Sequence, residues 1–283
     1  MTEAKPEPLS PDVFPADGYV FTHPVVRHSA MIAGYGYELE TRDRVFLKAR
    51  DAGDDGFGTV RLEREANVLE SLSHDQIPHL IEAHLEGKTP FIVTEAMPDD
   101  PFLRGRRFFA PDFAARLALS IVDPLEHVHD KSITHRDIKP GNLTMLGSAE
   151  VGLLDFDLAL TEEERVARTK QPHYFVGTPR YATPEQAYGG DIASTTDIYA
   201  AGITLFELLT GRVPYEGATL SEVCRKWHDG STVDYRNGDG DDIPEALAFI
   251  IEKAIRYKPD HRYQYAGEMA EDLERYLASA IPL

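Results

Sequence analysis

One stretch of eight consecutive residues decides how the rest of the chain is interpreted: His135-Arg136-Asp137-Ile138-Lys139-Pro140-Gly141-Asn142. It brings a carboxylate, an amine and a carboxamide close together in the sequence, at Asp137, Lys139 and Asn142. Transfer of a phosphoryl group needs a carboxylate near the attacking hydroxyl and an oxygen ligand for the metal ion that screens the phosphates. A surface turn that carries charged residues by chance is the alternative for so short a stretch.

The stretch resembles the catalytic loop of the eukaryotic-like (Hanks-type) Ser/Thr protein kinases, including the five-residue step from Asp137 to Asn142. A chance surface turn would not match at all eight positions. The resemblance implies that Asp137 accepts or orients the proton of the substrate hydroxyl and that Asn142 binds Mg²⁺. It also implies that Lys139 steadies the transferring phosphate and that the substrate is Ser or Thr rather than Tyr.

A second motif, Asp155-Phe156-Asp157, begins thirteen residues after Asn142 and resembles the kinase motif Asp-Phe-Gly. The resemblance implies that Asp155 chelates Mg²⁺ and that Phe156 packs under the helix of the small lobe. Asp157 departs from the family's glycine, which is useful there because it tolerates unusual backbone angles. Asp tolerates the left-handed region best after Gly and Asn, so we expect the change to affect movement of the motif more than metal binding.

A third segment, residues 177–185 (GTPRYATPE), resembles the substrate-docking end of the activation segment in Ser/Thr kinases. Thr183 stands where alanine is usual in the family. The resemblance implies a buried ion pair between Glu185 and Arg262. It also implies that Asp197 braces the backbone of the catalytic loop.

In the first third of the chain we expect an ion pair between Lys48 and Glu65. The strand Val45-Phe46-Leu47-Lys48 resembles the one that carries the ATP-binding lysine of kinases. Glu65 falls on the same face of a predicted helix as Leu62 and Leu69, so it points inward. By the same resemblance Thr94 is the gatekeeper, and backbone groups of Glu95 and Met97 in the hinge bond adenine.

The glycine-rich loop of the family, GxGxxGxV, is degenerate in this chain. Its best match is residues 29–36 (SAMIAGYG), where only the third glycine, Gly34, survives. Phe46 stands where a small alanine normally roofs the adenine, and Gly36 replaces the valine that normally roofs it from the neighbouring strand. We therefore expect Phe46 to stack on the base in room left by Gly36, so that Phe46→Ala weakens ATP binding. The opposite hypothesis is that Phe46 fills the pocket.

The periodicities predict a strand-rich part followed by a helical part. Strands are expected at 20–26, 31–39, 45–50, 80–85 and 90–94, and helices at 59–74, 113–129 and 196–210, with short strands and loops over 131–185 and further helices beyond 211. The segment 196–210 is apolar on nearly every side, so we expect this helix to be buried on all faces. With the resemblance this implies an α+β, two-lobed protein-kinase fold. The expected divisions are a disordered tail (1–18) and a kinase domain (19–283), with its N-lobe at about 19–95, hinge at about 96–99 and C-lobe at about 100–283.

Composition narrows the expected partners and location. The net charge of −19 repels nucleic acid and anionic lipid. The single cysteine, Cys224, allows no disulfide within the chain, which agrees with a reducing compartment. No apolar run approaches the ~18 residues of a membrane span, and the first residues are acidic and proline-rich, unlike a signal peptide. We expect a cytoplasmic protein that does not bind nucleic acid or cross a membrane.

Two functions from different classes fit these features. The first is an active kinase that transfers phosphate from ATP, with Mg²⁺, to a protein Ser or Thr. It is supported by retention of all six residues to which the resemblance gives a role in nucleotide binding or catalysis: Lys48, Glu65, Asp137, Lys139, Asn142 and Asp155. The second is a pseudokinase that serves as a binding or scaffold module, supported by the degenerate glycine loop, Phe46 and Asp157. A small-molecule kinase is disfavoured by the protein-docking segment. A regulatory protein is left open as a further partner.

Regulation is expected at the activation segment. An arginine such as Arg136, directly before the catalytic aspartate, usually contacts a phosphate on this segment. Thr169 is the first candidate for autophosphorylation and Thr161 the second, whereas Thr178 is expected to hydrogen-bond the catalytic loop. As an alternative, the acidic run 162–164 supplies Arg136 with a permanent partner.

Overall fold

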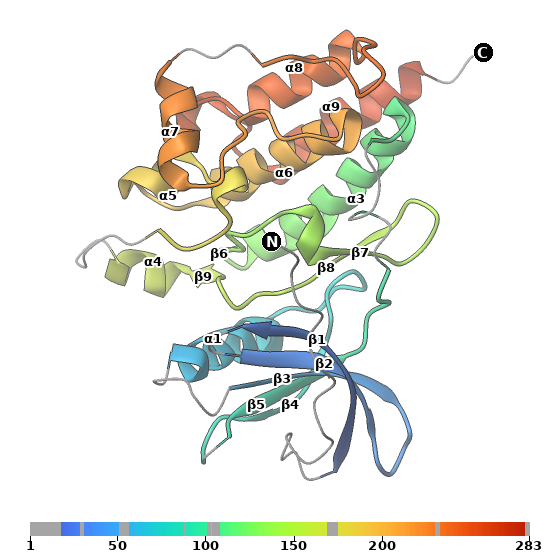
Figure 1. Cartoon of the computed structure of the whole chain (residues 1–283), viewed down its shortest axis with the longest axis vertical. Helices are drawn as coiled ribbons and strands as arrows, with labels where there is room; N and C mark the ends of the chain where they lie inside the picture. Colours follow the sequence, from blue (N-terminus) through green and yellow to red (C-terminus); the bar gives the residue numbers. More distant parts are fainter. Residues whose placement is uncertain are drawn as a thin grey trace. The chain divides into compact units, whose positions relative to one another are not determined.

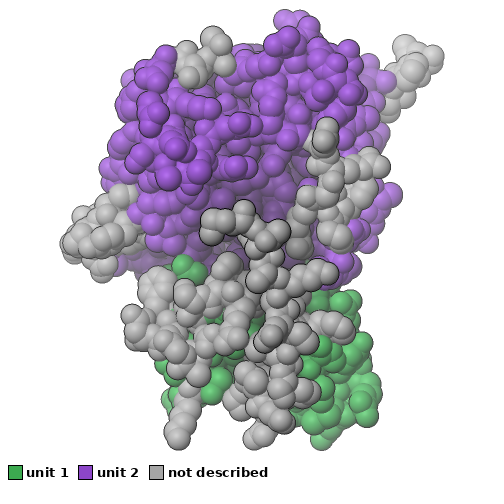
Figure 2. Space-filling model, in the orientation of Figure 1, with its two compact units in different colours: residues 1–97 green, residues 98–283 purple. Residues whose placement is uncertain are grey.

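The computed structural model describes residues 18–28, 31–50, 57–87, 89–100, 103, 108–168, 175–229 and 233–280. The chain divides into two compact units, unit 1 (residues 1–97) and unit 2 (residues 98–283), which Figure 2 shows in green and purple. Within the described part of the chain, no helix is both long and apolar enough to cross a membrane.

Unit 1 is built on a five-stranded antiparallel sheet with the order β1-β2-β3-β5-β4 (Figure 1). Its elements are β1 (Tyr19–His28), β2 (Met31–Glu38), β3 (Arg44–Arg50), α1 (Phe57–Ser71), β4 (Leu80–His84) and β5 (Phe91–Glu95). All five strands were predicted from the sequence to within about two residues. The helix begins two residues before the predicted start and ends three residues before the predicted end.

The two faces of this sheet differ. One face carries a hydrophobic cluster made of Phe21, Ile32, Val45, Leu47, Ala49, Phe91 and Val93. The other face receives α1, whose Leu62 and Ala66 pack with Ile92. Successive side chains of a strand point to opposite faces, and directly paired residues share one face. Phe46 and Lys48 therefore lie on the α1 face, between the buried residues of the opposite face.

Gly36 marks a close approach between β2 and its neighbours. A Cβ atom at this position would lie 2.5 Å from Leu47 Cδ1 and closer still to the carbonyl oxygen of Val20. Backbone atoms cannot move aside as a flexible side chain can. The position therefore requires glycine, and the missing side chain belongs to the face of the hydrophobic cluster.

We predict that Gly36→Ala lowers the free energy of unfolding by about 1–3 kcal/mol, because the added methyl group overpacks a filled region. Gly147→Ala is the matched control. A Cβ at Gly147 would meet only the side chain of Glu150, at 3.6 Å from Oε2 and 3.8 Å from Cβ, so its effect should stay within about 0.5 kcal/mol. Urea unfolding of both variants measures the difference, and equal midpoints would contradict the assignment.

Unit 2 is mainly helical. Its helices are α3 (Pro111–Asp130), α4 (Glu162–Arg168), α5 (Pro184–Tyr188), α6 (Ser194–Thr210), α7 (Leu220–His228), α8 (Glu245–Ala254) and α9 (Ala266–Ser279). Two small antiparallel sheets pair β6 (Ile133–Thr134) with β9 (Leu160–Thr161) and β7 (Leu143–Met145) with β8 (Val151–Leu153). Short 3₁₀ turns are η2 (Pro140–Asn142), η3 (Pro179–Tyr181) and η4 (Pro259–His261). The expectation of only strands and loops over 131–185 missed α4 and α5, which are seven and five residues long.

The α6 helix is the centre of unit 2. Fifteen of its 17 residues are buried, which confirms the prediction of a helix without a polar face. A Cβ at Gly202 would lie 2.6 Å from the Cβ of Ala254 in α8, so the absent side chain allows the two helices to pack closely. Gly211 ends α6 in the left-handed conformation, with φ of 73°.

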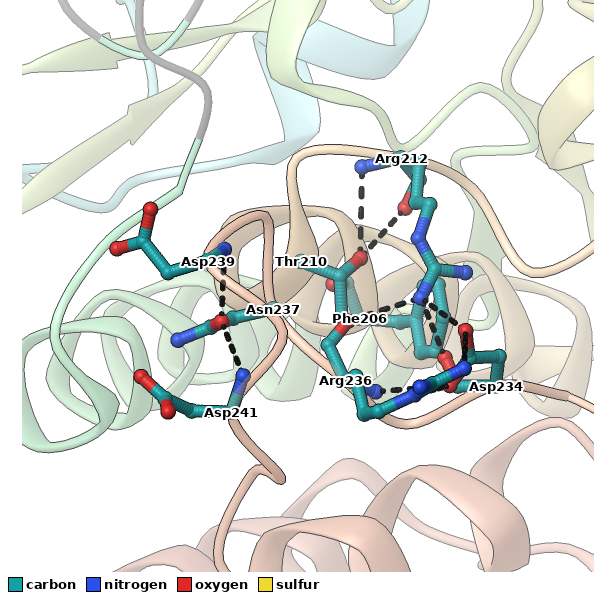
Figure 3. A network of polar contacts seen from close by, with 8 residues as sticks. All are labelled: Phe206, Thr210, Arg212, Asp234, Arg236, Asn237, Asp239 and Asp241. Carbon is teal, nitrogen blue, oxygen red and sulfur yellow. Dashed lines mark hydrogen bonds and ion pairs between the residues drawn. The ribbon is translucent and has the colours of Figure 1, made fainter.

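A polar network orders the chain that follows α6 (Figure 3). Arg212 Nη2 donates to the carbonyl oxygens of Asp234 and Arg236, at 2.9 and 2.8 Å. In the adjoining acidic turn, Asn237 Oδ1 accepts from the amides of Asp239 and Asp241, at 2.9 and 3.0 Å. The backbone of the acidic run 239–242 is thus held by the side chain of Asn237.

The expected ion pair between Glu185 and Arg262 is confirmed. Arg262 Nη1 and Nη2 donate to the two carboxylate oxygens at 2.7 and 2.8 Å, and both side chains are buried. The guanidinium also donates to the carbonyl oxygens of Arg256, Thr195 and Tyr257. All of these donors are satisfied within the protein, so the pair can be buried.

We predict that Arg262→Ala lowers the free energy of unfolding by about 3–5 kcal/mol, because it leaves the Glu185 carboxylate buried without its partner. Arg275→Ala is the control. The Arg275 side chain is 72% exposed where it pairs with Asp272, so its loss should cost less than about 1 kcal/mol. Denaturant unfolding compares the two, and similar costs would refute the structural role of Arg262.

Candidate active site

The catalytic loop of unit 2 is fixed by the buried carboxylate of Asp197 in the first turn of α6. Asp197 Oδ2 accepts from the amide of His135 at 2.8 Å and Oδ1 accepts from the amide of Arg136 at 2.7 Å. His129 Nε2, at the end of α3, lies 2.9 Å from Oδ2. Arg136 has a φ of 74°, an unfavourable value for a non-glycine residue. The expected bracing of the loop is therefore confirmed, and it holds a strained backbone.

Asp137 stands at the centre of a compact polar cluster. Thr178 Oγ1 donates to its Oδ1 at 3.0 Å, and Lys139 Nζ and Asn142 Nδ2 donate to its Oδ2 at 2.5 and 2.9 Å. Lys139 Nζ also contacts Thr178 Oγ1 at 2.7 Å. Lys139 and Asn142, both predicted to take part in the chemistry, thus converge with Thr178 on one carboxylate. The hydrogen bond of Thr178 to the catalytic loop was also expected from the sequence.

Asn142 and Asp155 emerge at the same end of the β7–β8 hairpin. Asn142 directly precedes β7, Asp155 lies two residues after β8, and the amide of Leu154 donates to the carbonyl oxygen of Asn142 at 2.9 Å. Asn142 Nδ2 donates to both the carbonyl oxygen and the carboxylate of Asp137. This directs the amide oxygen of Asn142 away from Asp137, where it can accept a cation.

These two residues fit Mg²⁺. The ion takes oxygen ligands and is usually held by one or two carboxylates together with substrate phosphates, rather than by a full cage of protein ligands. The described ranges contain no group of three or more His, Cys, Asp and Glu side chains that could hold a metal. Asn142 and Asp155 supply one carboxamide oxygen and one carboxylate, which matches such a site.

The backbone around Asp155 explains why Asp157 is tolerated. The left-handed φ occurs at Asp155, at 70°, and not at Asp157. The third position of the motif therefore does not use the backbone freedom of glycine in this conformation. Phe156 is fully buried against His135, with ring centroids 4.6 Å apart. His135 Nε2 lies 3.1 Å from the carbonyl oxygen of Leu154, so this nitrogen carries the proton and ties the two motifs together.

The docking segment is anchored to the catalytic loop and to α6. Thr183 caps α5 by accepting from the amide of Gln186, which explains the departure from the family's alanine. Gln186 Nε2 in turn donates to the carbonyl oxygen of Arg136 at 3.0 Å. The hydroxyl of Tyr181 donates to Glu207 of α6. Burial raises the pKa of Glu207 above its usual value, while the bond from Tyr181 acts in the opposite direction.

The residues proposed for regulation lie in different surroundings. Thr161 ends β9, and its hydroxyl accepts from the amide of Glu164 at 3.3 Å, so it caps the first turn of α4. Arg165 of α4 contacts Asp191 at 2.5 Å and Glu162 at 2.6 Å. Thr169 lies outside the described residues. Arg136 is buried in the catalytic loop.

In unit 1 the expected ion pair between Lys48 and Glu65 is present. Lys48 Nζ lies 2.6 and 2.8 Å from the two carboxylate oxygens, and Glu65 is only 3% exposed. Glu65 shares the buried face of α1 with Leu62 and Leu69, as its spacing predicted. The pair holds the ammonium group of Lys48 on the α1 face of the sheet.

The expected hinge residues already have partners within unit 1. Thr94 and Glu95 end β5, and the amide of Glu95 donates to the carbonyl oxygen of His79 at 2.9 Å. Thr94 Oγ1 lies 3.3 Å from the carbonyl oxygen of Glu95. The carbonyl oxygen of Met97 accepts from the hydroxyl of Tyr35 at 3.2 Å. Tyr35 was not among the residues predicted to form the site.

The register of β2 corrects the expected roof over the adenine. Tyr35 pairs with Phe46, and Phe46 pairs with Thr94, so these three side chains form one row on the α1 face. Gly34 and Gly36 pair with Leu47 and Val45, and therefore lie on the other face. Gly36 leaves no room for the Phe46 ring. The alternation of side chains along β2, counted from the β2–β3 hairpin, is the signal that could have identified Tyr35.

The fold and the site define the catalytic domain of a protein kinase, with a β-rich unit that carries the paired lysine and a helical unit that carries the Asp137 cluster. The chain matches the protein kinase domain family over residues 36–273. It belongs to this family, and to its eukaryotic-like (Hanks-type) Ser/Thr branch.

The similar proteins with assigned names are also serine/threonine-protein kinases. The chain is 31% identical over 228 residues to the serine/threonine-protein kinase PrkC of Bacillus subtilis (strain 168). The aligned region covers 79% of this chain and 35% of PrkC. It is 35% identical over 226 residues to the serine/threonine-protein kinase PkaA of Streptomyces coelicolor, and the aligned region covers 77% of this chain and 39% of PkaA. The probable serine/threonine-protein kinase PknB of Corynebacterium glutamicum is 30% identical to this chain over 237 residues, and the aligned region covers 78% of this chain and 36% of PknB. The chain thus spans less than two-fifths of the length of these relatives.

Proposed function

We propose that this domain transfers the γ-phosphoryl group of ATP to a Ser or Thr hydroxyl of a protein substrate. The observation that carries the proposal is the convergence of Thr178, Lys139 and Asn142 on the Asp137 carboxylate. A carboxylate fixed in this way can accept a hydrogen bond from the attacking hydroxyl and orient it. The ammonium group of Lys139, held beside it, can balance negative charge on the phosphoryl group in transfer.

Residues for the nucleotide and for its metal ion are proposed within each unit separately. Lys48, fixed by Glu65, is a cation suited to the α- and β-phosphates. The carbonyl oxygen of Glu95 and the amide of Met97 are the backbone groups proposed for adenine, and Thr94 and Phe46 belong to the same part of the site. Gly34, which lies on the opposite face of the sheet, is proposed as the surviving glycine of the degenerate glycine loop. Asn142 and Asp155 would hold Mg²⁺, which, when bound, neutralises the charge that develops on the phosphate oxygens.

The wider context of the domain belongs to the same proposal. Residues 96–99 would act as the hinge between an N-lobe that begins near residue 19 and a C-lobe that begins near residue 100. A protein substrate fits the docking segment that ends at Glu185, which is tied to the catalytic loop through Gln186. We place the activity in the cytoplasm, where ATP is available. Nucleic acid is not expected as a partner, because the net charge is −19.

We predict that Asp137→Asn lowers the rate of phosphate transfer by about 10²–10⁴-fold, the usual contribution of a general base, while ATP binding stays within about twofold. Asp155→Asn should also weaken binding of Mg-ATP, because a metal ligand is lost. Phosphate incorporation and calorimetric titration measure the two effects. Asp130→Asn, at an exposed position at the end of α3, is the control and should behave as wild type. An Asp137→Asn variant that keeps the wild-type rate would disprove the assignment.

We further propose control by phosphorylation of the activation segment, with Arg136 as the residue that receives the phosphate. After incubation with Mg-ATP, we expect phosphate on Thr169 first and on Thr161 second, because the hydroxyl of Thr161 is engaged at the start of α4. Thr178 should stay unmodified, since its hydroxyl contacts both Asp137 and Lys139. Mass spectrometry of the purified protein tests this order. Phosphate on neither Thr169 nor Thr161 in an active enzyme would favour a permanent acidic partner from residues 162–164.

A further inference from the structure

Tyr35 reaches from β2 to the last residue of unit 1. Its hydroxyl donates to the carbonyl oxygen of Met97 at 3.2 Å, and its side chain is almost fully buried. Residue 97 is separated from Tyr35 by 62 positions in the sequence, so this bond connects the second strand of the sheet to the segment that follows β5. Both residues lie within unit 1.

Two neighbours hold the Tyr35 ring in this position. The ring of Phe46 meets it edge to face, with centroids 5.1 Å apart and planes at 74°. The guanidinium carbon of Arg44 lies 4.1 Å from the centroid of the Tyr35 ring, within the range of a cation–π contact. The ring is therefore packed in a defined orientation on the face of the sheet that carries Lys48.

In this position the Tyr35 ring would compete with a purine for the same space. In the function proposed above, the edge of the base faces the backbone of Glu95 and Met97, and Phe46 belongs to the same part of the site. The Tyr35 ring starts beside Phe46 and ends at Met97, so it crosses the same region. A close-packed site cannot hold an added ring and a purine in one volume.

We propose that Tyr35 is a latch that closes the base-binding face of unit 1, and that a nucleotide must break the bond between Tyr35 and Met97 in order to bind. The proposal deepens the kinase function and rests on it for the position of the base. The latch makes the affinity for nucleotide depend on one hydroxyl group. Rotation of one side chain opens it, and the backbone of β2 can keep its pairing with β3.

The latch predicts that Tyr35→Phe binds Mg-ADP about two- to tenfold more tightly than wild type. The variant keeps the ring but removes one neutral hydrogen bond that only the closed form makes, and a bond of that kind is worth a factor of this size. Isothermal titration of the full chain measures the dissociation constant. Tyr37→Phe is the matched control, because Tyr37 lies on the same strand and the same face but is 42% exposed, and its affinity should equal that of wild type.

A second variant removes the whole ring. Tyr35→Leu should bind Mg-ADP at least as tightly as Tyr35→Phe, since it clears the path to Met97 while keeping an apolar side chain beside Phe46. Thermal unfolding without nucleotide checks that both variants fold. Unchanged or weaker binding by folded Tyr35→Phe and Tyr35→Leu would overturn the latch, as would absence of nucleotide binding in wild type and both variants.

Phosphate incorporation is measured in parallel, so that the two proposals can fail separately. Tighter binding by Tyr35→Phe without any phosphate transfer in wild type would support the latch and refute the kinase activity. Transfer by wild type with no gain in affinity for Tyr35→Phe would support the activity and refute the latch.

Discussion

The catalytic half of this protein depends on one buried carboxylate, Asp197. A charge removed from water is costly unless hydrogen bonds satisfy it, and Asp197 receives the amides of His135 and Arg136 together with a ring nitrogen of His129. Because these donors come from the catalytic loop and from α3, satisfying the carboxylate fixes both segments against α6. The same contacts hold Arg136 at a φ of 74°. Because Asp137 directly follows Arg136 in the chain, they also set the position of its backbone.

The surrounding structure gives this anchor its rigidity. The α6 helix, which carries Asp197, is buried on nearly every side, so the carboxylate cannot move with a flexible element. The buried ion pair between Glu185 and Arg262 stabilises the end of the docking segment, and Arg262 also binds the carbonyl oxygen of Thr195 in the first turn of α6. Catalytic loop and docking segment are therefore positioned by one helix. The α6 helix would therefore position both the substrate hydroxyl and the carboxylate that orients it.

Unit 1 uses a different constraint, the strict alternation of side chains on a strand. Alternation places Lys48 on the face that α1 covers, where Glu65 can meet it, and places Leu47 in the hydrophobic cluster. The same rule puts Tyr35 beside Phe46 and turns Gly36 toward Leu47. Two aromatic rings thus stand where a kinase usually carries small or branched side chains. Recognition of the nucleotide base is the property in which this domain is expected to differ most from its relatives.

The sequence by itself determined the family, the order of the motifs and the two ion pairs, because these depend on residue type and spacing along the chain. It also predicted the strands of unit 1 and the buried helix α6 from their periodicity. It could not assign the faces of β2 when the glycine loop was degenerate, since a shift of one residue moves every side chain to the other face. The contacts of His129 with Asp197 and of Tyr35 with Met97 join residues more than sixty positions apart. Only the tertiary structure decided them, because no local pattern records which distant groups meet.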